Sequence, residues 1–192
     1  MHDRVFDPSQ VHKLEAKERL LWLPPAEILG WLELRPGITV ADIGAGTGYF
    51  AIPIAQAIAP GGRVFAVDLQ PELLEILRGK LARPDAPANI VLLQGTASST
   101  GLAEGNCDLA LLANVWHELD DHPAALAELA RILKRGGRIA VLDWRPDAER
   151  PPGPPLEHRL PACKVQQFFQ DHGKRVDMVR NVGQYSYLVM AR

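Results

Sequence analysis

A glycine-rich stretch, VADIGAGTGYF, is the part of the chain whose residue types are best suited to holding a ligand. Gly44, Gly46 and Gly48 stand at every second position, and Asp42 precedes them in an apolar run. A loop between a strand and a helix offers free backbone N–H groups and a partial positive charge. Glycine also permits unusual φ angles and a close approach of the ligand to the backbone. Because so many glycines exceed what a tight turn needs, the stretch predicts a ligand site.

The glycine spacing separates the kinds of ligand that such a loop could bind. A dinucleotide loop has the pattern GxGxxG, and Tyr49 stands where its third glycine would be. A phosphate loop would have a Lys directly after its last glycine, and this chain has none there. Asp68 ends the run VFAVD, and its two oxygens could each accept a hydrogen bond from a ribose hydroxyl. Because NAD sites use the same device, Asp68 predicts a ribose without naming the nucleotide.

Alternating helix and strand patterns from Pro24 to Trp144 are expected to position these residues. The strand-like runs are rich in Val, Ile, Leu and Ala with little alternation, which is typical of strands covered on both faces. They cover residues 38–43, 63–68, 89–94, 107–114 and 137–144. Helices are expected between them over residues 48–59, 71–81 and 123–134. This order predicts an α/β domain with a parallel sheet.

The two ends of the chain carry different patterns. An amphipathic helix is expected over residues 11–23, and the stretch PPAEILGWLEL leads into a second helix. Residues 147–158 are proline-rich and are expected to form a loop without regular structure. A helix over residues 162–172 and two alternating strands, KRVDMVRNV and QYSYLVMAR, follow. A turn at residues 182–184 predicts that these two strands form an antiparallel hairpin at the sheet edge.

The order of the motifs resembles that of the class I S-adenosylmethionine-dependent methyltransferases over nearly the whole chain. The segments that carry the resemblance are DIGAGTG, AVD, LLQGTA, CDLALLANVWHEL and ILKRGGRIAVLDW. The most similar group is that of small ubiquinone/menaquinone-biosynthesis-like methyltransferases. The resemblance implies an α/β, Rossmann-like, seven-stranded and mostly parallel sheet with a C-terminal antiparallel hairpin and helices on both faces. It also implies a single domain, residues 1–192, with an N-terminal helical lid (1–36), a cofactor-binding core (37–145) and a C-terminal part (146–192).

The resemblance further implies S-adenosylmethionine as the cofactor and S-adenosylhomocysteine as its product. Carried over along the motifs, the expected cofactor-binding residues are Asp42, Gly44, Ala45, Gly46, Thr47, Gly48, Tyr49, Asp68, Leu69, Thr96, Ala97, Asn114 and Val115. In the family an Asp often stands in the place of Thr96 and binds the adenine amino group. A hydroxyl accepts a hydrogen bond but carries no charge, so we expect weaker selectivity for adenine in this chain.

His117 is the candidate catalytic base. It follows the fourth strand, where the family places residues that face the substrate, and an imidazole can accept a proton near neutral pH. The alternative is a structural His117 that packs beside the helix starting at Pro123. Glu118 is interpreted as a charge at a helix start and Asp143 as a structural acid. Arg159, after the proline-rich loop, could reach an anionic substrate or lie on the surface.

The composition limits the partners and the compartment. The 192 residues carry a net charge of −2, so no basic field attracts nucleic acid. No apolar run approaches the roughly 20 residues of a membrane-spanning helix, so no membrane insertion is expected. Cys107 and Cys163 form no CxxC pair and are interpreted as reduced thiols of a cytoplasmic protein; no metal-binding cluster is expected. The apolar run from Leu20 to Leu23 could pair with a second copy to make a homodimer.

These patterns predict a methyltransferase that passes the methyl group of S-adenosylmethionine to a small-molecule acceptor by in-line displacement. Two alternatives stay open. One is an NAD(P)-binding Rossmann oxidoreductase, against which Tyr49 and the terminal hairpin argue. The other is a non-catalytic cofactor-binding regulatory protein, which the presence of Thr96 keeps open, because fold does not determine function. The acceptor atom, carbon, oxygen or nitrogen, is left undetermined.

Overall fold

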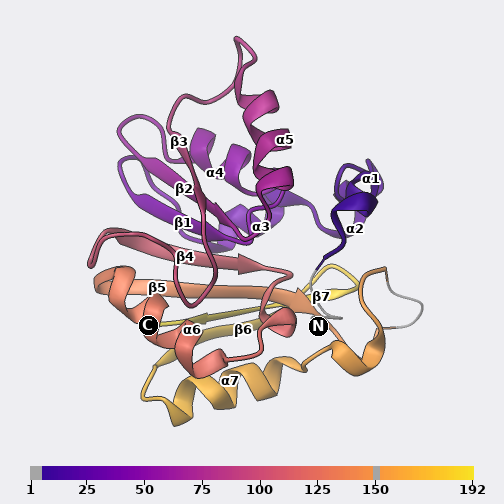
Figure 1. Ribbon diagram of the computed structural model, residues 1–192. Coiled ribbons are helices and arrows are strands. Elements are labelled where there is room, and N and C mark those ends of the chain that lie inside the picture. Colours follow the sequence, from indigo (N-terminus) through magenta and orange to yellow (C-terminus); the bar gives the residue numbers. More distant parts are fainter. Residues whose placement is uncertain (1–5, 149–151) are drawn as a thin grey trace.

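The computed structural model describes residues 6–148 and 152–192 and has one seven-stranded sheet at its centre (Figure 1). The strand order is β3-β2-β1-β4-β5-β7-β6. Neighbours from β3 to β5 are parallel, and β7 runs antiparallel to both of its neighbours. The strands are β1 (Thr39–Ile43), β2 (Arg63–Asp68), β3 (Ile90–Gln94), β4 (Cys107–Ala113), β5 (Leu133–Trp144), β6 (Val176–Val182) and β7 (Ser186–Ala191). The predicted Rossmann-like sheet with its C-terminal antiparallel hairpin is confirmed.

Helices cover both faces of the sheet, because successive strand residues send apolar side chains to opposite sides. Two buried clusters result, one on each face. The first face packs against α3 (Pro25–Trp31), α4 (Ala51–Ala57) and α5 (Pro71–Leu81). The second face packs against α6 (His122–Ile132) and α7 (Ala162–Asp171).

Helix α5 has the bounds predicted from its sequence, and local signals account for them. Pro71 occupies the first turn, where a missing N–H costs nothing, and Glu72 follows it near the positive end of the helix dipole. Arg78 and Lys80 lie in the last turn, where the dipole favours cations. The buried residues of this helix are Leu73, Leu74 and Leu77.

The expected helix over residues 11–23 is instead two short helices, so that prediction is wrong. They are α1 (Val11–Leu14) and α2 (Arg19–Trp22), separated by a turn. Glu15 ends α1 and directs its carboxylate to Lys80 and Thr47. Tertiary contacts of this kind override an amphipathic pattern, which considers only one element at a time.

Three other boundaries differ from the expectation. Helix α4 begins at Ala51 and not at residue 48, because Gly48 has a φ of +87°, outside the helical region. Strand β5 begins at Leu133, ahead of residue 137, because Leu133 pairs with Cys107 beside a bulge in the β4–β5 ladder. The proline-rich loop contains a short 3-10 turn, Leu156–His158, and its residues 149–151 lie outside the described part.

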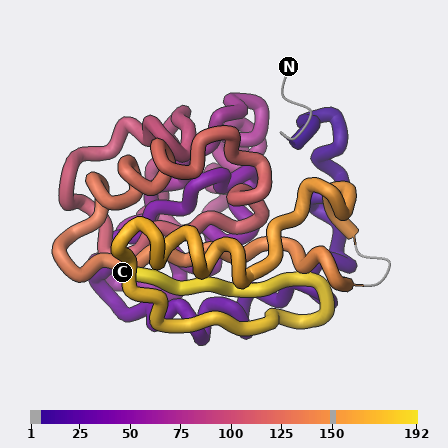
Figure 2. The backbone as a smooth tube through the Cα atoms, turned by 90° about the horizontal axis from the view of Figure 1, so that it is seen from below, coloured from indigo at the N-terminus to yellow at the C-terminus, as the bar shows by residue number. Residues whose placement is uncertain are grey.

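The C-terminal hairpin completes the sheet beside α7 (Figure 2). Gly183, with a φ of +54°, makes the turn between β6 and β7. Strand β7 is buried along its whole length between β5 and β6, whereas β6 is the half-exposed edge. In the described ranges, no helix has the length and apolar character needed to cross a membrane.

Candidate cofactor and active site

The glycine loop joins β1 to α4 and bends back onto the end of β2. The N–H groups of Gly44 and Ala45 both donate to the carbonyl oxygen of Val67, at 2.7 and 3.0 Å. All three loop glycines have positive φ angles, which other residues rarely adopt. The sequence therefore folds this way only because glycine occupies these positions.

The three glycines differ in their surroundings. A Cβ at Gly44 would lie 2.2 Å from Cγ2 of Val115, and a Cβ at Gly48 would lie 2.4 Å from a leucine of α5. At Gly46 the nearest atom would be Cδ1 of Leu14, at an ordinary contact distance of 3.7 Å. Gly44 and Gly48 are thus required by the packing of the protein itself. Their approach to a cofactor stays a prediction.

Asp68 holds the glycine loop against the end of β2. Its Oδ2 accepts the N–H of Gly46 at 2.7 Å, and its Oδ1 accepts the N–H of Gln70 at 2.9 Å. Burial raises the pKa of Asp68, and these backbone hydrogen bonds oppose the shift. A carboxylate has about four acceptor sites, so both oxygens keep capacity for a ligand hydroxyl. The structural role of Asp68 in shaping the loop was not foreseen from the sequence.

Buried acceptor atoms without a partner gather at this end of the sheet. Among the described residues, Oδ2 of Asp42, Oε1 of Gln70 and Oδ1 of Asn114 are buried and accept no hydrogen bond. Asn114 also has a φ of +59°, a strained value for a residue other than glycine. Burial first, and then the charge of Asp68, raise the pKa of Asp42 to about 7. Leaving such groups unpaired costs about 1–3 kcal/mol each, so a ligand that brings donors to them would be favoured.

The residues expected around the adenine lie beyond β2 and β3. Leu69 is 49% exposed and could offer its side chain to a flat ring. Thr96 is exposed, forms a backbone bridge with Ser99 and places its hydroxyl 3.3 Å from that of Ser98. Ala97 is buried beneath them. The polar turn thus engages Thr96 within the protein, and its contact with adenine stays a prediction.

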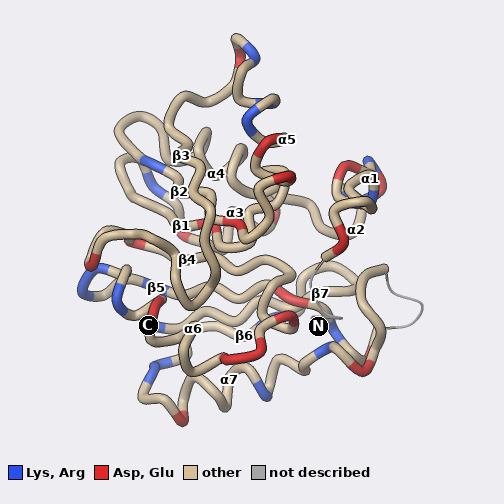
Figure 3. Tube along the Cα trace, in the orientation of Figure 1, with Lys and Arg blue, Asp and Glu red and all other residues tan. Residues whose placement is uncertain are grey.

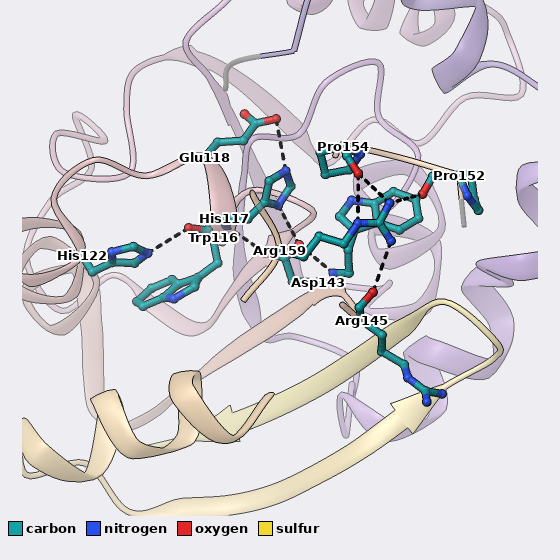
Figure 4. Close-up of polar contacts among 10 residues, drawn as sticks. Trp116, His117, Glu118, His122, Asp143, Arg145, Pro152, Pro154 and Arg159 are labelled. Carbon is teal, nitrogen blue, oxygen red and sulfur yellow. Dashed lines mark hydrogen bonds and ion pairs between the residues drawn. The ribbon is translucent and has the colours of Figure 1, made fainter. Parts of the chain in front are cut away.

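His117 and Asp143 form a buried pair across the ends of β4 and β5 (Figure 4). Nδ1 of His117 lies 2.7 Å from Oδ1 of Asp143, and the backbone N–H of His117 donates to Oδ2 at 2.9 Å. The N–H of Trp144 donates to Oδ1 at 2.8 Å. Burial alone would lower the pKa of His117, but the charge and hydrogen bond of Asp143 outweigh it and raise that pKa. The carboxylate therefore sets both the orientation and the charge of the ring.

The structural alternative for His117 is wrong in its capping part only, because the ring is buried as that alternative expects but does not cap the following helix. Helix α6 begins at His122 and is capped by Asp121, whose carboxylate accepts the N–H of Ala124 at 2.8 Å. His117 lies on a separate 3-10 turn, Trp116–Glu118. Its ring is only 4% exposed, so it is available to a substrate only on the side of Nε2.

Glu118 covers that side of the ring. Its Oε1 lies 3.9 Å from Nε2 of His117, and burial raises the pKa of its carboxyl to about 7. Glu118 is the acidic residue in the single turn of the 3-10 helix Trp116–Glu118, and it does not belong to α6, which starts at His122. This end of the sheet therefore carries an imidazole, His117, and four acids: Asp42, Asp68, Glu118 and Asp143.

Arg159 is buried and has a structural task, so the expected surface position is wrong, and its reach to an anionic substrate stays a prediction. Its guanidinium donates to the carbonyl oxygens of Pro152, Pro154 and Arg145, at 2.7 to 3.2 Å (Figure 4). It also lies over the ring of Trp144, with 5.2 Å to the centroid. Arg159 thus fastens the proline-rich loop to the end of β5, beside the His117–Asp143 pair.

The N-terminal segment lies on the glycine loop and is fastened there by several polar contacts. Oε1 of Glu15 accepts from the hydroxyl of Thr47 and from Nζ of Lys80, which also donates to the Thr47 carbonyl at 2.8 Å. The hydroxyl of Tyr49 donates to the Leu23 carbonyl at 2.7 Å. Further contacts are those of Gln70 with the carbonyl of Phe6 and of Arg19 with the ring of Tyr49.

Sequence reasoning placed Glu15 on the N-terminal lid but missed Arg19 and Lys80 as residues of this region. For Arg19 a signal was present, since it directly precedes the apolar run Leu20 to Leu23 on a helix expected to be amphipathic. A charged residue next to such a run can be drawn into the interior with it. For Lys80 the sequence holds no signal, because it meets Glu15 across 65 positions.

A surface hollow of about 540 Å³ lies elsewhere, lined by Gln56, Asp85 and Asn89 among others. Asn89 precedes β3, so this hollow lies where the parallel strands begin. In open α/β sheets, ligands bind beyond the carboxyl ends of the strands. We therefore assign the candidate site to the glycine loop and not to this hollow.

Comparison with known proteins identifies the family. Residues 41–141, more than half of the chain, match the methyltransferase domain family. The chain belongs to this family, in the class I S-adenosylmethionine-dependent group related to ubiquinone/menaquinone-biosynthesis methyltransferases, as its motifs predicted. S-adenosylmethionine is the cofactor of this class.

Individual relatives agree with this assignment. An uncharacterized methyltransferase of Mycobacterium tuberculosis is 38% identical over 127 residues, which cover 66% of this chain and 47% of the relative. A demethylmenaquinone methyltransferase of Lactococcus lactis is 30% identical over 107 residues, covering 56% of this chain and 42% of the relative. This chain thus spans about half the length of these curated relatives. A crystal structure of a SAM-dependent methyltransferase from Aquifex aeolicus has a TM-score of 0.91 and 31% identity, and covers 97% of this chain and 98% of that one.

The residues at the site fit S-adenosylmethionine. The unpartnered atoms at the loop are acceptors, namely Oδ2 of Asp42, Oε1 of Gln70 and Oδ1 of Asn114. The cofactor brings donors of matching kind, an ammonium, two ribose hydroxyls and an adenine amine. Gly46, where a Cβ would meet no atom closer than 3.7 Å, and Asp68 at the end of the neighbouring strand complete the set.

Proposed function

We propose that the protein transfers the methyl group of S-adenosylmethionine to a small-molecule acceptor by in-line displacement. The observation that carries the proposal is the group of buried, unpartnered acceptors beside Asp68 and the glycine loop. Bound S-adenosylmethionine supplies a methyl group that its sulfonium has already activated. The work left to the chain is to hold the cofactor and the acceptor in line and to exclude water.

In this proposal the cofactor is held by the residues of the glycine loop and of the ends of β2, β3 and β4. They are Asp42, Gly44, Ala45, Gly46, Thr47, Gly48, Tyr49, Asp68, Leu69, Thr96, Ala97, Asn114 and Val115. Asp68 keeps the N–H of Gly46 and also accepts from the ribose. The N-terminal segment, bonded to Thr47 and Tyr49, closes the cofactor from solvent.

His117 acts as the general base if the acceptor carries a proton that must leave. Asp143 holds Nδ1, so Nε2 is the atom that takes the proton. Asp143 is a positioning residue, because it is 1% exposed and touches only protein. A base is not required for an acceptor with a free lone pair.

The proposal of a small acceptor, and not nucleic acid, rests on charge. Lys and Arg are interspersed with Asp and Glu along the described chain (Figure 3). The net charge of −2 gives no attraction for a polyanion.

The compartment and assembly are further parts of the proposal. Cys107 and Cys163 are both free thiols, which supports a cytoplasmic protein. Leu20 and Leu21 are 54% and 85% exposed, and we propose that they form the contact of a homodimer. Leu23, in contrast, is fully buried in the core of the chain and takes no part in such a contact. A monomer mass in solution at micromolar concentration would remove the dimer.

The first experiment compares ligands by thermal shift and calorimetry on the full chain. S-adenosylhomocysteine should raise the melting temperature, and NAD should not, because only a ligand of the folded state stabilises it. Stabilisation by NAD alone would overturn the proposal in favour of an oxidoreductase. Binding of S-adenosylhomocysteine without methyl transfer across a broad panel of metabolites would favour a non-catalytic regulatory protein.

A further inference from the structure

Arg19 is a buried cation without an acidic partner. Its side chain belongs to α2 and is only 7% exposed. Within residues 6–148 and 152–192, its one hydrogen bond goes from Nη1 to the carbonyl oxygen of Leu14, at 3.2 Å, and no carboxylate forms an ion pair with it. A guanidinium has five N–H donors and cannot lose its charge under ordinary conditions. Buried charges are normally paired, so most of the donor capacity of Arg19 is left for a partner.

The place of Arg19 limits what that partner can be. Its guanidinium lies 4.0 Å from the ring centroid of Tyr49, the residue that follows the last loop glycine. Leu14, which accepts its hydrogen bond, lies beside the open position at Gly46. Arg19 therefore lies beside the glycine loop at Gly46 and Tyr49, two of the residues that the proposed function gives to the cofactor.

Two acids attract Arg19 without pairing with it. Glu15 is already engaged by Thr47 and Lys80. Asp42 has a buried Oδ2 that accepts no hydrogen bond from any described residue. The guanidinium of Arg19 thus has unused donors, and the Asp42 carboxyl, to which the backbone N–H of Ala51 also bonds, has an unused acceptor in Oδ2. A ligand that carries a carboxylate and an ammonium on one carbon would satisfy both.

We infer that Arg19 binds the α-carboxylate of the cofactor through its guanidinium, with Asp42 opposite at the α-amine. The planar fork of a guanidinium matches the two oxygens of a carboxylate, which gives a charge-assisted, bidentate pair. The inference rests on the proposed function, and it adds a residue outside the motifs of the family. It also links the cofactor to the N-terminal segment, because Arg19 comes from that segment and not from the sheet.

The alternative is that Arg19 only fastens the N-terminal segment to Tyr49 by its cation–π contact. A structural fastener would affect every ligand of the cleft equally. A carboxylate-binding residue affects only ligands that carry the carboxylate. This difference decides the design of the test.

The test is calorimetry with two ligands, S-adenosylhomocysteine and its decarboxylated form, which keeps the amine and lacks the carboxylate. The unaltered chain should bind S-adenosylhomocysteine about 10- to 100-fold more tightly, the range for hydrogen bonds to a charged group. Arg19→Gln should remove most of that difference while it leaves the affinity for the decarboxylated form within about threefold. Arg19→Lys should retain part of it, because an ammonium pairs with one oxygen only. Lys17→Gln, an exposed cation of the same segment, is the matched control and should change neither affinity.

Equal weakening of both ligands by Arg19→Gln would overturn the inference and identify a structural fastener. Equal affinity of the unaltered chain for the two ligands would overturn it as well, even if Arg19→Gln failed to fold. Failure of the unaltered chain to bind either ligand would instead remove the proposed function on which the inference rests.

Discussion

At the scale of single residues, Asp68 has two tasks that one substitution removes together. It holds the N–H of Gly46 and that of Gln70, and it is the proposed acceptor for the ribose. Asp68→Ala should weaken binding of S-adenosylhomocysteine by about 1.5–3 kcal/mol, the scale of hydrogen bonds to a charged group. Calorimetry gives the dissociation constant. Asp85→Ala removes an exposed carboxylate and is the control, and an unchanged constant for Asp68→Ala would contradict the ribose contact.

His117 provides a second prediction at this scale. Burial lowers the pKa of His117, whereas the charge and hydrogen bond of Asp143 raise it, and the net shift is upward. Asp143→Asn should therefore move the pKa of His117 below its ordinary value of about 6.5, because burial remains and the charge is gone. NMR titration of the imidazole measures the shift, with the signal of exposed His12 as an internal control. An unchanged His117 titration would show that the pair is not coupled.

The raised pKa of His117 also predicts how stability and turnover depend on pH. A raised pKa in the folded state means that the pair adds stability below about pH 6.5, and that this stability is lost as the pH rises through the folded value. A neutral His117 is needed for it to act as a base. Turnover that depends on this base should therefore increase with pH through the folded value.

At the scale of elements, the contact between the glycine loop and α5 depends on Gly48. A Cβ there would lie 2.4 Å from a leucine side chain, and the φ of +87° is strained for any other residue. Gly48→Ala should lower the free energy of unfolding by roughly 1–3 kcal/mol. Gly79→Ala, an exposed position in α5 with open space around it, should raise it by about 0.5–1 kcal/mol. Urea denaturation compares the two variants. Similar effects of both substitutions would contradict the packing described for the loop.

At the scale of the whole molecule, burial of acids at one end of the sheet should make stability depend on pH. Burial raises the pKa of Asp42 and of Glu118 to about 7, so the folded state binds more protons than the unfolded state. The free energy of unfolding should therefore fall as the pH rises from about 5 to 8, by at most about 1.4 kcal/mol per pH unit for each group. Below about pH 5, carboxylates whose pKa is lowered in the folded state, such as Glu128, make the free energy of unfolding increase with pH.

Urea denaturation of the cofactor-free chain across this range measures the dependence. Asp42→Asn should make the free energy of unfolding fall less steeply with pH, because the amide does not titrate and can still accept a hydrogen bond from the backbone. A stability that stays level or increases between about pH 5 and pH 8 would contradict the burial of these acids.

The sequence by itself determined the order of the elements and the class of the protein. Parallel strands with buried faces read as continuous apolar runs, and glycine and proline mark their ends, so local patterns suffice for them. The bounds of α5 and β2 agree with the prediction for this reason. The glycine spacing and Asp68 were also visible, because a loop that needs positive φ admits few other residues.

Only the tertiary structure decided which polar residues meet. Nδ1 of His117 contacts Asp143 across 26 positions, and Glu15 contacts Lys80 across 65, and no periodicity records such pairs. The N-terminal helix divides, and Arg159 turns inward, because each side chain is satisfied by groups from other elements. Burial raises the pKa of Asp42 and encloses Arg19, which has no acidic partner among the described residues. It depends on everything packed around a group and therefore exists only once the chain has folded.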